Sequence, residues 1–206
     1  MDTRRAIDIA VSSTALAISA VPMLFIAAAV RLTNGPSVLF KQKRYGLDGK
    51  PFDILKFRTM SDERNARGEL FPDDMRVTRF GLFLRRTGLD ELPQMLNILK
   101  GDMSIIGPRP MAEEPEVEGW NQRYQVRPGL IGLSAVREKS STWITEPEER
   151  LSNDLEYIKT PKKLPLDLKI AFRAVSLVLT RRNELSDKPG RPSPTATRNP
   201  LSEYEQ

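Results

Sequence analysis

The chain has 206 residues, a formal net charge of +5 and a pI near 9.6. This suits one domain with a modest core rather than two, and indicates an anionic partner such as phospholipid, nucleotide phosphate or nucleic acid. Because it contains no Cys and no His, catalysis must use carboxylates, hydroxyls, Lys or Arg, and any metal is expected to be a hard, oxygen-binding ion such as Mg²⁺.

The first predicted element is an apolar helix over Ala6–Leu32, interrupted by Asp8, Pro22 and Arg31. At about 1.5 Å per residue, a straight helix of this length exceeds the roughly 30 Å hydrocarbon core of a bilayer, which indicates membrane residence. The early Asp8 and the lack of a clear small-residue cleavage site favour a retained anchor over a cleaved signal peptide.

The path of this helix is set by its flanking charges and by its proline. Arg4 and Arg5 precede the helix and further basic residues follow it, a symmetry that fits both ends on one side of the membrane. Pro22 is expected to kink the helix, with the Ser19 hydroxyl bonding a freed carbonyl. The residues alone are equally consistent with a helix that dips into the bilayer and with a kinked helix that crosses it.

Two strands are predicted next, Ser37–Lys43 and Pro51–Arg58, joined by a turn at residues 46–49. The polar stretch Ser61–Asp74 is typical of a surface loop or short helix. Arg79–Arg86 mixes bulky apolar residues with Arg at helical spacing. This pattern fits either a helix lying in a membrane interface or an ordinary amphipathic surface helix.

A further helix is predicted directly after Asp90 and Glu91, because apolar residues recur at 92, 95, 96 and 99 and Pro93 suits a helix start. A short strand-like segment and a rigid loop at residues 107–110 follow. The last helix is predicted over Leu166–Arg182. Residues 183–206 are rich in Pro, Ser, Thr and charge, which predicts a disordered tail.

The adjacent carboxylates Asp90 and Glu91 are the candidate chemical centre. Such pairs at a helix start commonly act only as caps, but this pair is bracketed by cations that suit phosphate oxygens. A carboxylate kept ionised by these cations and by Mg²⁺ can attack phosphorus without a histidine base. The cations are Lys56, Arg58, Arg85, Arg86 and Arg109.

Ordered motifs extend along nearly the whole chain to about Arg182. At these motifs the sequence resembles the monotopic phosphoglycosyl transferases, the bacterial sugar transferase family. The motifs are Arg4-Arg5 with Asp8, Gly-Pro-Ser-Val-Leu-Phe-Lys-Gln from Gly35, Lys-Phe-Arg-Thr-Met from Lys56, Leu-Asp-Glu-Leu-Pro-Gln from Leu89, Lys-Gly-Asp-Met-Ser from Lys100, Ile-Gly-Pro-Arg-Pro from Ile106, Arg-Pro-Gly-Leu-Ile-Gly-Leu from Arg127 and Leu-Asp-Leu-Lys-Ile from Leu166.

The resemblance implies a two-step exchange. Asp90 would attack the β-phosphate of a UDP-sugar and release UMP, and the phosphate of a polyprenol (undecaprenyl) lipid would then attack the covalent phosphosugar-aspartate. This is the first membrane step of a glycoconjugate pathway such as exopolysaccharide synthesis. Mg²⁺ would be held at Asp90 and Glu91, and Arg109 would contact phosphate from the loop that contains Pro108 and Pro110. We expect Lys56, Arg58 and Arg85 to join the substrate-binding set.

The predicted fold is α+β, with a re-entrant membrane helix over residues 1–35, a catalytic domain over 36–182 and the tail over 183–206. The domain is expected to combine a small antiparallel sheet or hairpin with several helices, some amphipathic and interfacial, on the cytoplasmic face of the bacterial inner membrane. The family's helix break is usually Ser-Pro, whereas here Val21 precedes Pro22. Residues 133–139 also depart from the family's usual Leu-Ala-Gln-Val-Asn-Gly-Arg, which points to an unusual donor if that loop selects nucleotide or sugar.

The expected partners are a UDP-sugar, polyprenol phosphate and membrane phospholipid, and a homo-oligomer is left open. A basic membrane scaffold, or a family member without activity, is the main alternative. The intact Asp90, Glu91 and Arg109 argue against it. A nucleic-acid binder is disfavoured because basic residues are interspersed with acidic ones, aromatic residues are few, and the apolar N-terminus would have no role.

Overall fold

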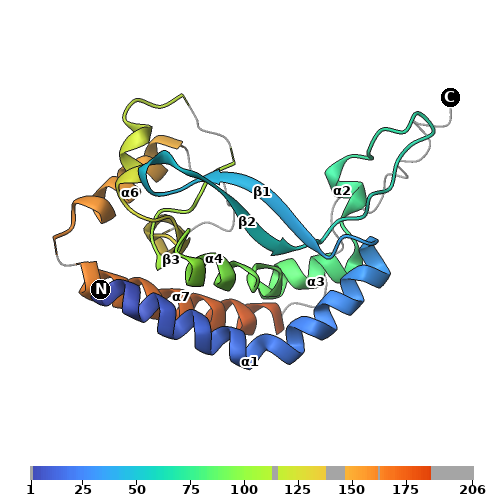
Figure 1. Cartoon of the computed structure of the whole chain (residues 1–206), viewed down its shortest axis with the longest axis horizontal. Helices are drawn as coiled ribbons and strands as arrows, with labels where there is room; N and C mark the ends of the chain where they lie inside the picture. The colour runs from blue at the N-terminus through green and yellow to red at the C-terminus, as the bar shows by residue number, and fades with distance from the viewer. Residues whose placement is uncertain (1, 113–115, 138–146, 162, 187–206) are drawn as a thin grey trace.

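The computed structural model of the chain describes residues 2–112, 116–137, 147–161 and 163–186. Within them a bent N-terminal helix, α1 (Thr3–Asn34), lies beside the C-terminal helix α7 (Lys163–Ser186), beneath α3 (Arg79–Thr87) and α4 (Gln94–Lys100), as Figure 1 shows. A hairpin of β1 (Leu39–Tyr45) and β2 (Pro51–Phe57) covers the opposite side of α3 and α4. This mixture of helices with a small antiparallel sheet confirms the predicted α+β class.

The helix α1 is helical throughout, with Pro22 inside it. Its most apolar 18-residue window has a mean hydropathy of 2.1 and is only 11% buried inside the protein, so length and composition suffice for a membrane segment. Figure 1 shows that the helix bends near its middle. Ser19 does not bond the Ile18 carbonyl, which Pro22 leaves without its N–H partner. Its hydroxyl donates instead to the Ala15 carbonyl at 2.6 Å, a local bond that often bends helices.

The first turns of α1 are bonded to the rest of the molecule by the three charged residues predicted to begin the membrane segment. The buried Asp8 carboxylate accepts hydrogen bonds from Ser104 Oγ at 3.1 Å and Ile105 N at 3.0 Å. Arg5 donates to the carbonyls of residues 98 and 99 in the last turn of α4, where helix carbonyls outnumber the backbone N–H donors. Arg4 pairs with Asp167 of α7, Nε to Oδ2, at 2.7 Å.

The last turn of α1 is bonded to the same body. Asn34, which is 2% exposed, donates from Nδ2 to the Arg58 carbonyl at 2.7 Å and accepts from Thr78 Oγ1 at 2.9 Å. Ile26 and Val30 pack with Phe57, among others, in one apolar cluster. Both ends of α1 therefore face one domain, while its middle is exposed.

The hairpin pairs β1 with β2 in antiparallel register from Leu39↔Phe57 to Tyr45↔Pro51. β1 lies two residues later than predicted, because the turn closes at Gly46, whose N–H donates to the Lys50 carbonyl at 2.9 Å. A 3₁₀ turn, η1 (Leu47–Gly49), completes the connection. Phe52 and Ile54 of β2 build a core cluster with Met95, Ile98 and Met103.

A second, parallel sheet joins β3 (Ser104–Ile106) to β4 (Gly129–Ile131), whereas only antiparallel pairing was predicted. The two chains come very close at Gly107 and Gly129: a Cβ added to Gly129 would lie 2.0 Å from Gly107 N. Glycine is therefore required there, since any side chain would collide with backbone. The contact holds the loop that carries Pro108, Arg109 and Pro110 against the turn before β4.

The remaining elements lie around this second sheet or in the segment between β2 and α3, which projects from the molecule in Figure 1. α7 begins before and ends after the predicted Leu166–Arg182, so it extends into the predicted tail, whose remainder lies outside the described residues. In the departing segment 133–139, the first five residues form α5, and the last two lie outside the described residues. These elements include α2 (Asp73–Arg76), η3 (Trp120–Gln125), α5 (Leu133–Arg137) and α6 (Pro147–Lys159).

Candidate active site

Asp90 and Glu91 lie in a tight 3₁₀ turn, η2 (Leu89–Glu91), between α3 and α4. Gly88, with φ 70°, ends α3 in the left-handed conformation and starts this turn. The pair was predicted at a helix start with Pro93 close to it, and the turn does lead into α4, whose first residue is Gln94, directly after Pro93. The turn lies where α3, α4 and β2 meet, so both carboxylates are held by packed elements.

The Asp90 side chain is buried at 8% exposure, and within the described residues it has no ion pair and no bond from another side chain. Burial raises the pKa of its carboxyl above the ordinary value, and the neighbouring Glu91 adds to the rise. Lys56 and Arg85 oppose this rise in pKa without cancelling it. The Asp90 carboxylate is therefore a buried anion in need of a cationic or metal partner.

The Glu91 carboxylate has two cationic partners. Lys56 Nζ lies 2.7 Å and Arg109 Nη2 lies 2.8 Å from Glu91 Oε1. Burial alone would raise the pKa of Glu91, but these two cations outweigh burial and hold the pKa below its ordinary value. Glu91 thus stays ionised and joins a cation of the hairpin to a cation of the 107–110 loop.

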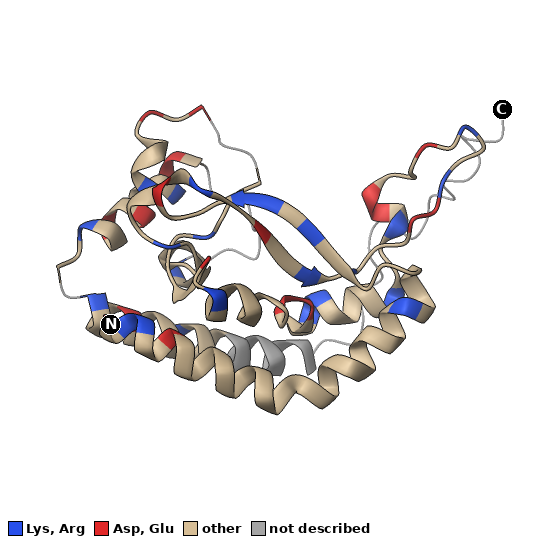
Figure 2. Ribbon diagram, viewed as in Figure 1, with Lys and Arg blue, Asp and Glu red and all other residues tan. Residues whose placement is uncertain are grey.

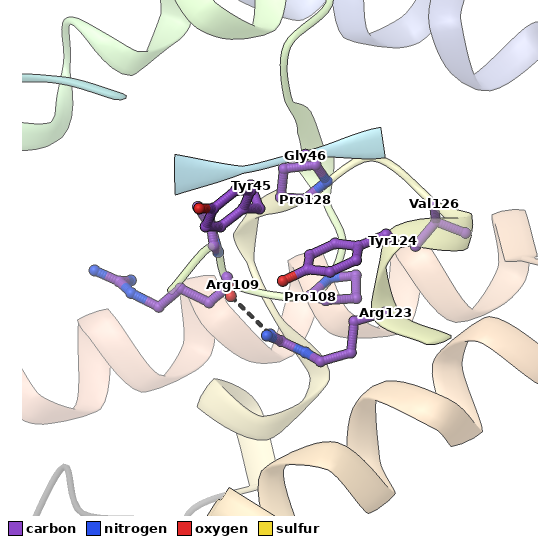
Figure 3. Close-up of a pocket in the computed structure, with 9 residues that line it drawn as sticks. Tyr45, Gly46, Pro108, Arg109, Arg123, Tyr124, Val126 and Pro128 are labelled. Atoms are coloured by element: carbon purple, nitrogen blue, oxygen red, sulfur yellow. Dashed lines mark hydrogen bonds between the residues drawn. The ribbon is translucent and has the colours of Figure 1, made fainter. Parts of the chain in front are cut away.

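The side chain of Arg109 is positioned through its own backbone. Arg123 of η3 donates from Nη2 to the Arg109 carbonyl at 2.7 Å, the bond drawn in Figure 3. Arg123 in turn pairs with Asp154 of α6 at 2.7 Å, and the two side chains are only 4% and 2% exposed. Its guanidinium also lies over the Trp120 ring, 4.3 Å from the centroid. The loop is therefore fixed by a buried ion pair.

The other predicted substrate-binding residues lie around this centre at different distances from it. Arg85 donates from Nε to Thr59 Oγ1 at 2.8 Å and lies near Asp90. Arg58 pairs with Asp62, and within the described residues it makes no ion pair with Asp90 or Glu91. Pro108 and Pro110 line a small pocket beside Arg109. The same pocket is lined by Tyr45, Gly46, Arg123, Tyr124, Val126 and Pro128, as Figure 3 shows.

Arg44, Arg123 and Asp154 were not predicted as site residues. Each is a common charged residue that lies outside the sequence motifs of the candidate centre. Arg44 lies one residue beyond the predicted strand Ser37–Lys43, so its place on the face of the hairpin that carries Lys56 became visible only in the structure. Nothing in the spacing of Arg123 and Asp154 indicates that they meet.

The carboxylate pair fits the donor set of Mg²⁺. This ion commonly takes one or two protein carboxylates and completes its octahedron with water and substrate phosphates. The described residues contain no group of three or more metal-ligating side chains, so a site at Asp90 and Glu91 would depend on phosphate oxygens for further ligands. The buried Asp90 carboxylate, which lacks an ion-pair partner among the described residues, suits such an ion.

Comparison with known proteins gives a consistent family. The family described as "Bacterial sugar transferase" matches residues 2–181. The chain is 40% identical over 183 residues to the "Uncharacterized sugar transferase EpsL" of Bacillus subtilis, covering 87% of this chain and 88% of that protein. It is 37% identical over 192 residues to the "Exopolysaccharide production protein PSS" of Rhizobium leguminosarum, covering 86% and 96%.

One longer relative is named for a specific transfer reaction. The chain is 41% identical over 183 residues to the UDP-glucose:undecaprenyl-phosphate glucose-1-phosphate transferase of Klebsiella pneumoniae. That match covers 84% of this chain but only 39% of the Klebsiella protein. The match to the family extends over α1, the carboxylate turn and most of α7, and on this basis the chain belongs to the bacterial sugar transferase family and is a transferase.

Proposed function

We propose that this transferase moves a sugar-1-phosphate from a UDP-sugar to polyprenol (undecaprenyl) phosphate and releases UMP. The reaction would be the first membrane step of a glycoconjugate pathway. The name of the Klebsiella relative supports the two substrates. The observation that carries the proposal is the buried Asp90 carboxylate beside Glu91, which is itself bonded by Lys56 and Arg109.

In the first step an Asp90 carboxylate oxygen attacks the β-phosphorus of the donor. A phosphorus–oxygen bond forms, the bond from that phosphorus to the bridging oxygen breaks, and UMP leaves with the bridging oxygen. In the second step a phosphate oxygen of the lipid attacks the same phosphorus and displaces the Asp90 carboxylate. The products are UMP and a polyprenol diphosphate sugar, and the enzyme returns to its starting form.

The cations of the site stabilise the charge that builds up on the transferred phosphate. Arg109 presents a forked donor, and Lys56 a point charge, next to the position where the phosphate must lie. Mg²⁺, when bound at Asp90 and Glu91, would neutralise further phosphate charge. Arg85, which is bonded to Thr59, is available to bind the phosphate of the lipid substrate.

The proposal is tested by measuring UMP release from protein in detergent or nanodiscs, given a panel of UDP-sugars, Mg²⁺ and polyprenol phosphate, with each component omitted in turn. We expect continuous release with all components and none without Mg²⁺. Without the lipid, we expect a stoichiometric burst of UMP, because the covalent intermediate traps one sugar phosphate on each enzyme. Folded protein that releases no UMP from any UDP-sugar would contradict the proposal and favour a membrane scaffold.

The proposal also includes the path of α1, which enters and leaves the cytoplasmic membrane on its cytoplasmic side. Three observations support a re-entrant path. Both ends of α1 are bonded to one domain, its middle has no charge between Asp8 and Arg31 (Figure 2), and it bends rather than running straight. The exposed apolar residues of neighbouring helices, Leu82, Phe83, Leu168, Phe172 and Val175, suit an interface with lipid.

This path predicts the labelling of two single-cysteine variants. Because the chain contains no Cys, a Cys added before Met1, or made by Ser37→Cys at an exposed position after α1, would be its only thiol. We expect a membrane-impermeant thiol reagent to label neither variant in intact cells and both in inverted membranes. Labelling of one of the two from outside the cell would show that α1 crosses the bilayer.

A further inference from the structure

The register of the hairpin places a second cation on the face that carries Lys56. Along β2 the side chains of Phe52, Ile54 and Lys56 share the inner face, because alternate residues of a strand point the same way. Arg44 of β1 is directly opposite Phe52, and directly opposed side chains lie on one face. Arg44 therefore shares the inner face, and its neighbour Lys43 lies on the outer one.

The contacts of Arg44 do not neutralise its charge. One guanidinium nitrogen donates to Gln42 Oε1 at 2.6 Å, and another makes a long 3.5 Å contact with the Pro110 carbonyl. Its Nε is buried without a hydrogen-bond partner. Within the described residues Arg44 has no carboxylate partner, so this half-buried cation lacks an anion.

Arg109 lies close to this unpaired cation. Burial, and then repulsion from Arg109, lower the pKa of Arg44 below its ordinary value. The Arg109 guanidinium pairs with the Glu91 carboxylate, whereas no carboxylate among the described residues neutralises Arg44. Two guanidiniums that repel each other, one of them with a free buried N–H, are the arrangement that an oxyanion with several acceptors satisfies.

We propose that Arg44 and Arg109 together bind a phosphate group of the substrate, and that this group belongs to the diphosphate of the nucleotide-sugar donor. The inference rests on the proposed function and extends its donor site to a residue of the hairpin. The donor is favoured over the lipid phosphate because Arg44 belongs to the β1–β2 hairpin. The apolar helices α1 and α7 lie on the opposite side of the molecule (Figure 1).

The pocket beside Arg109 supports the donor assignment. Tyr45, the residue after Arg44, lines this pocket with Tyr124, and their ring centroids are 6.2 Å apart. Aromatic rings beside Arg109 provide the apolar surface that the rest of a nucleotide needs. A donor phosphate held by Arg44 and Arg109 would lie next to the Glu91 carboxylate and hence to Asp90.

The test is UDP binding by full-length Arg44→Gln, measured by calorimetry in detergent with Mg²⁺. We expect the Kd for UDP to rise roughly 10- to 100-fold, as for loss of a charge-assisted hydrogen bond. We also expect the Tm of the unliganded variant to equal or exceed that of wild type, because an unneutralised charge is removed, and UDP to raise its Tm less. The control is Lys43→Gln, which removes the same charge from the outer face, where Lys43 is 81% exposed.

The outcomes separate the two proposals. Unchanged UDP affinity in Arg44→Gln, when wild type binds UDP, overturns the role of Arg44 and leaves the proposed function intact. Wild type that binds no UDP overturns the proposed function itself. A raised KM for polyprenol phosphate with unchanged UDP affinity would overturn the donor assignment and identify the lipid phosphate instead. If Arg44→Gln lowers the Tm, Arg44→Lys, which keeps the charge, serves as a second variant. Wild-type UDP affinity in both variants overturns the inference.

Discussion

Replacing Asp90 by Asn is expected to abolish UMP release, with a loss on the order of 10⁴-fold or more, because the amide cannot form the covalent phosphosugar. The substitution is nearly isosteric and removes a buried charge, so the fold and membrane association should be retained. The measurement is the burst of UMP in the absence of lipid, with intact-protein mass spectrometry of the trapped adduct. Both signals should disappear together.

The matched control is Asp53→Asn, which removes a carboxylate from an exposed position of β2 and should leave the burst unchanged. The pH profile gives a second readout. Burial raises the pKa of Asp90, and the attacking form is the ionised one, so kcat/KM of wild type should fall as pH falls, beginning above the range of an ordinary Asp. Near-normal turnover by Asp90→Asn would remove Asp90 from the nucleophile's role.

The second large effect is expected at the buried pair of Arg123 and Asp154. Asp154→Leu alone leaves the Arg123 charge buried without its partner, which should lower the free energy of unfolding by about 3–5 kcal/mol. The double variant Arg123→Met with Asp154→Leu removes both charges and should recover most of that stability. Denaturation followed by Trp fluorescence is suitable, because Trp120 is 4% exposed and lies under Arg123.

The double variant separates folding from function. The double variant should fold stably but release UMP more slowly than wild type. The Arg109 carbonyl loses its donor, and the Arg109 side chain therefore loses its fixed position beside Glu91. Removing the exposed partner of another pair, by Glu156→Gln opposite Arg137, should change stability by only about 0–1 kcal/mol. A double variant with full activity would show that Arg123 serves folding alone.

The elements with a clear hydrophobic period were predictable from the sequence. The hairpin follows from alternation at Phe52 and Ile54, and α3 and α7 follow from apolar residues at helical spacing. The strand-like segment that forms β3 was predicted, but its parallel pairing with β4 was missed, because strands of three residues are too short to show a period. Its pairing depends on the close approach of Gly107 and Gly129, which only the folded chain brings together.

The candidate site was predictable in its chemistry but not in its pairings. The sequence indicated that Asp90 and Glu91 lie among cations, and two of those cations, Lys56 and Arg109, contact Glu91. It did not indicate that the Arg58 guanidinium pairs with Asp62 four residues later. Net charge and spacing indicate that cations are near, whereas the choice of partner depends on the strand register and on the direction in which each side chain leaves the backbone.

The contacts of the first turn of α1 with residues near the C-terminus constrain when this helix can be held in place during synthesis. Arg4 meets Asp167, 163 residues further along the chain, and its guanidinium also donates to Tyr157. During translation the N-terminal helix is therefore complete long before the residues that hold its first turn have been made. Because closing a loop of this length costs conformational entropy that the contact repays only once it forms, the first turn of α1 can be held in place only after α7 has been made. A product truncated before α7 would have an unfinished anchor, and not merely a shorter C-terminus.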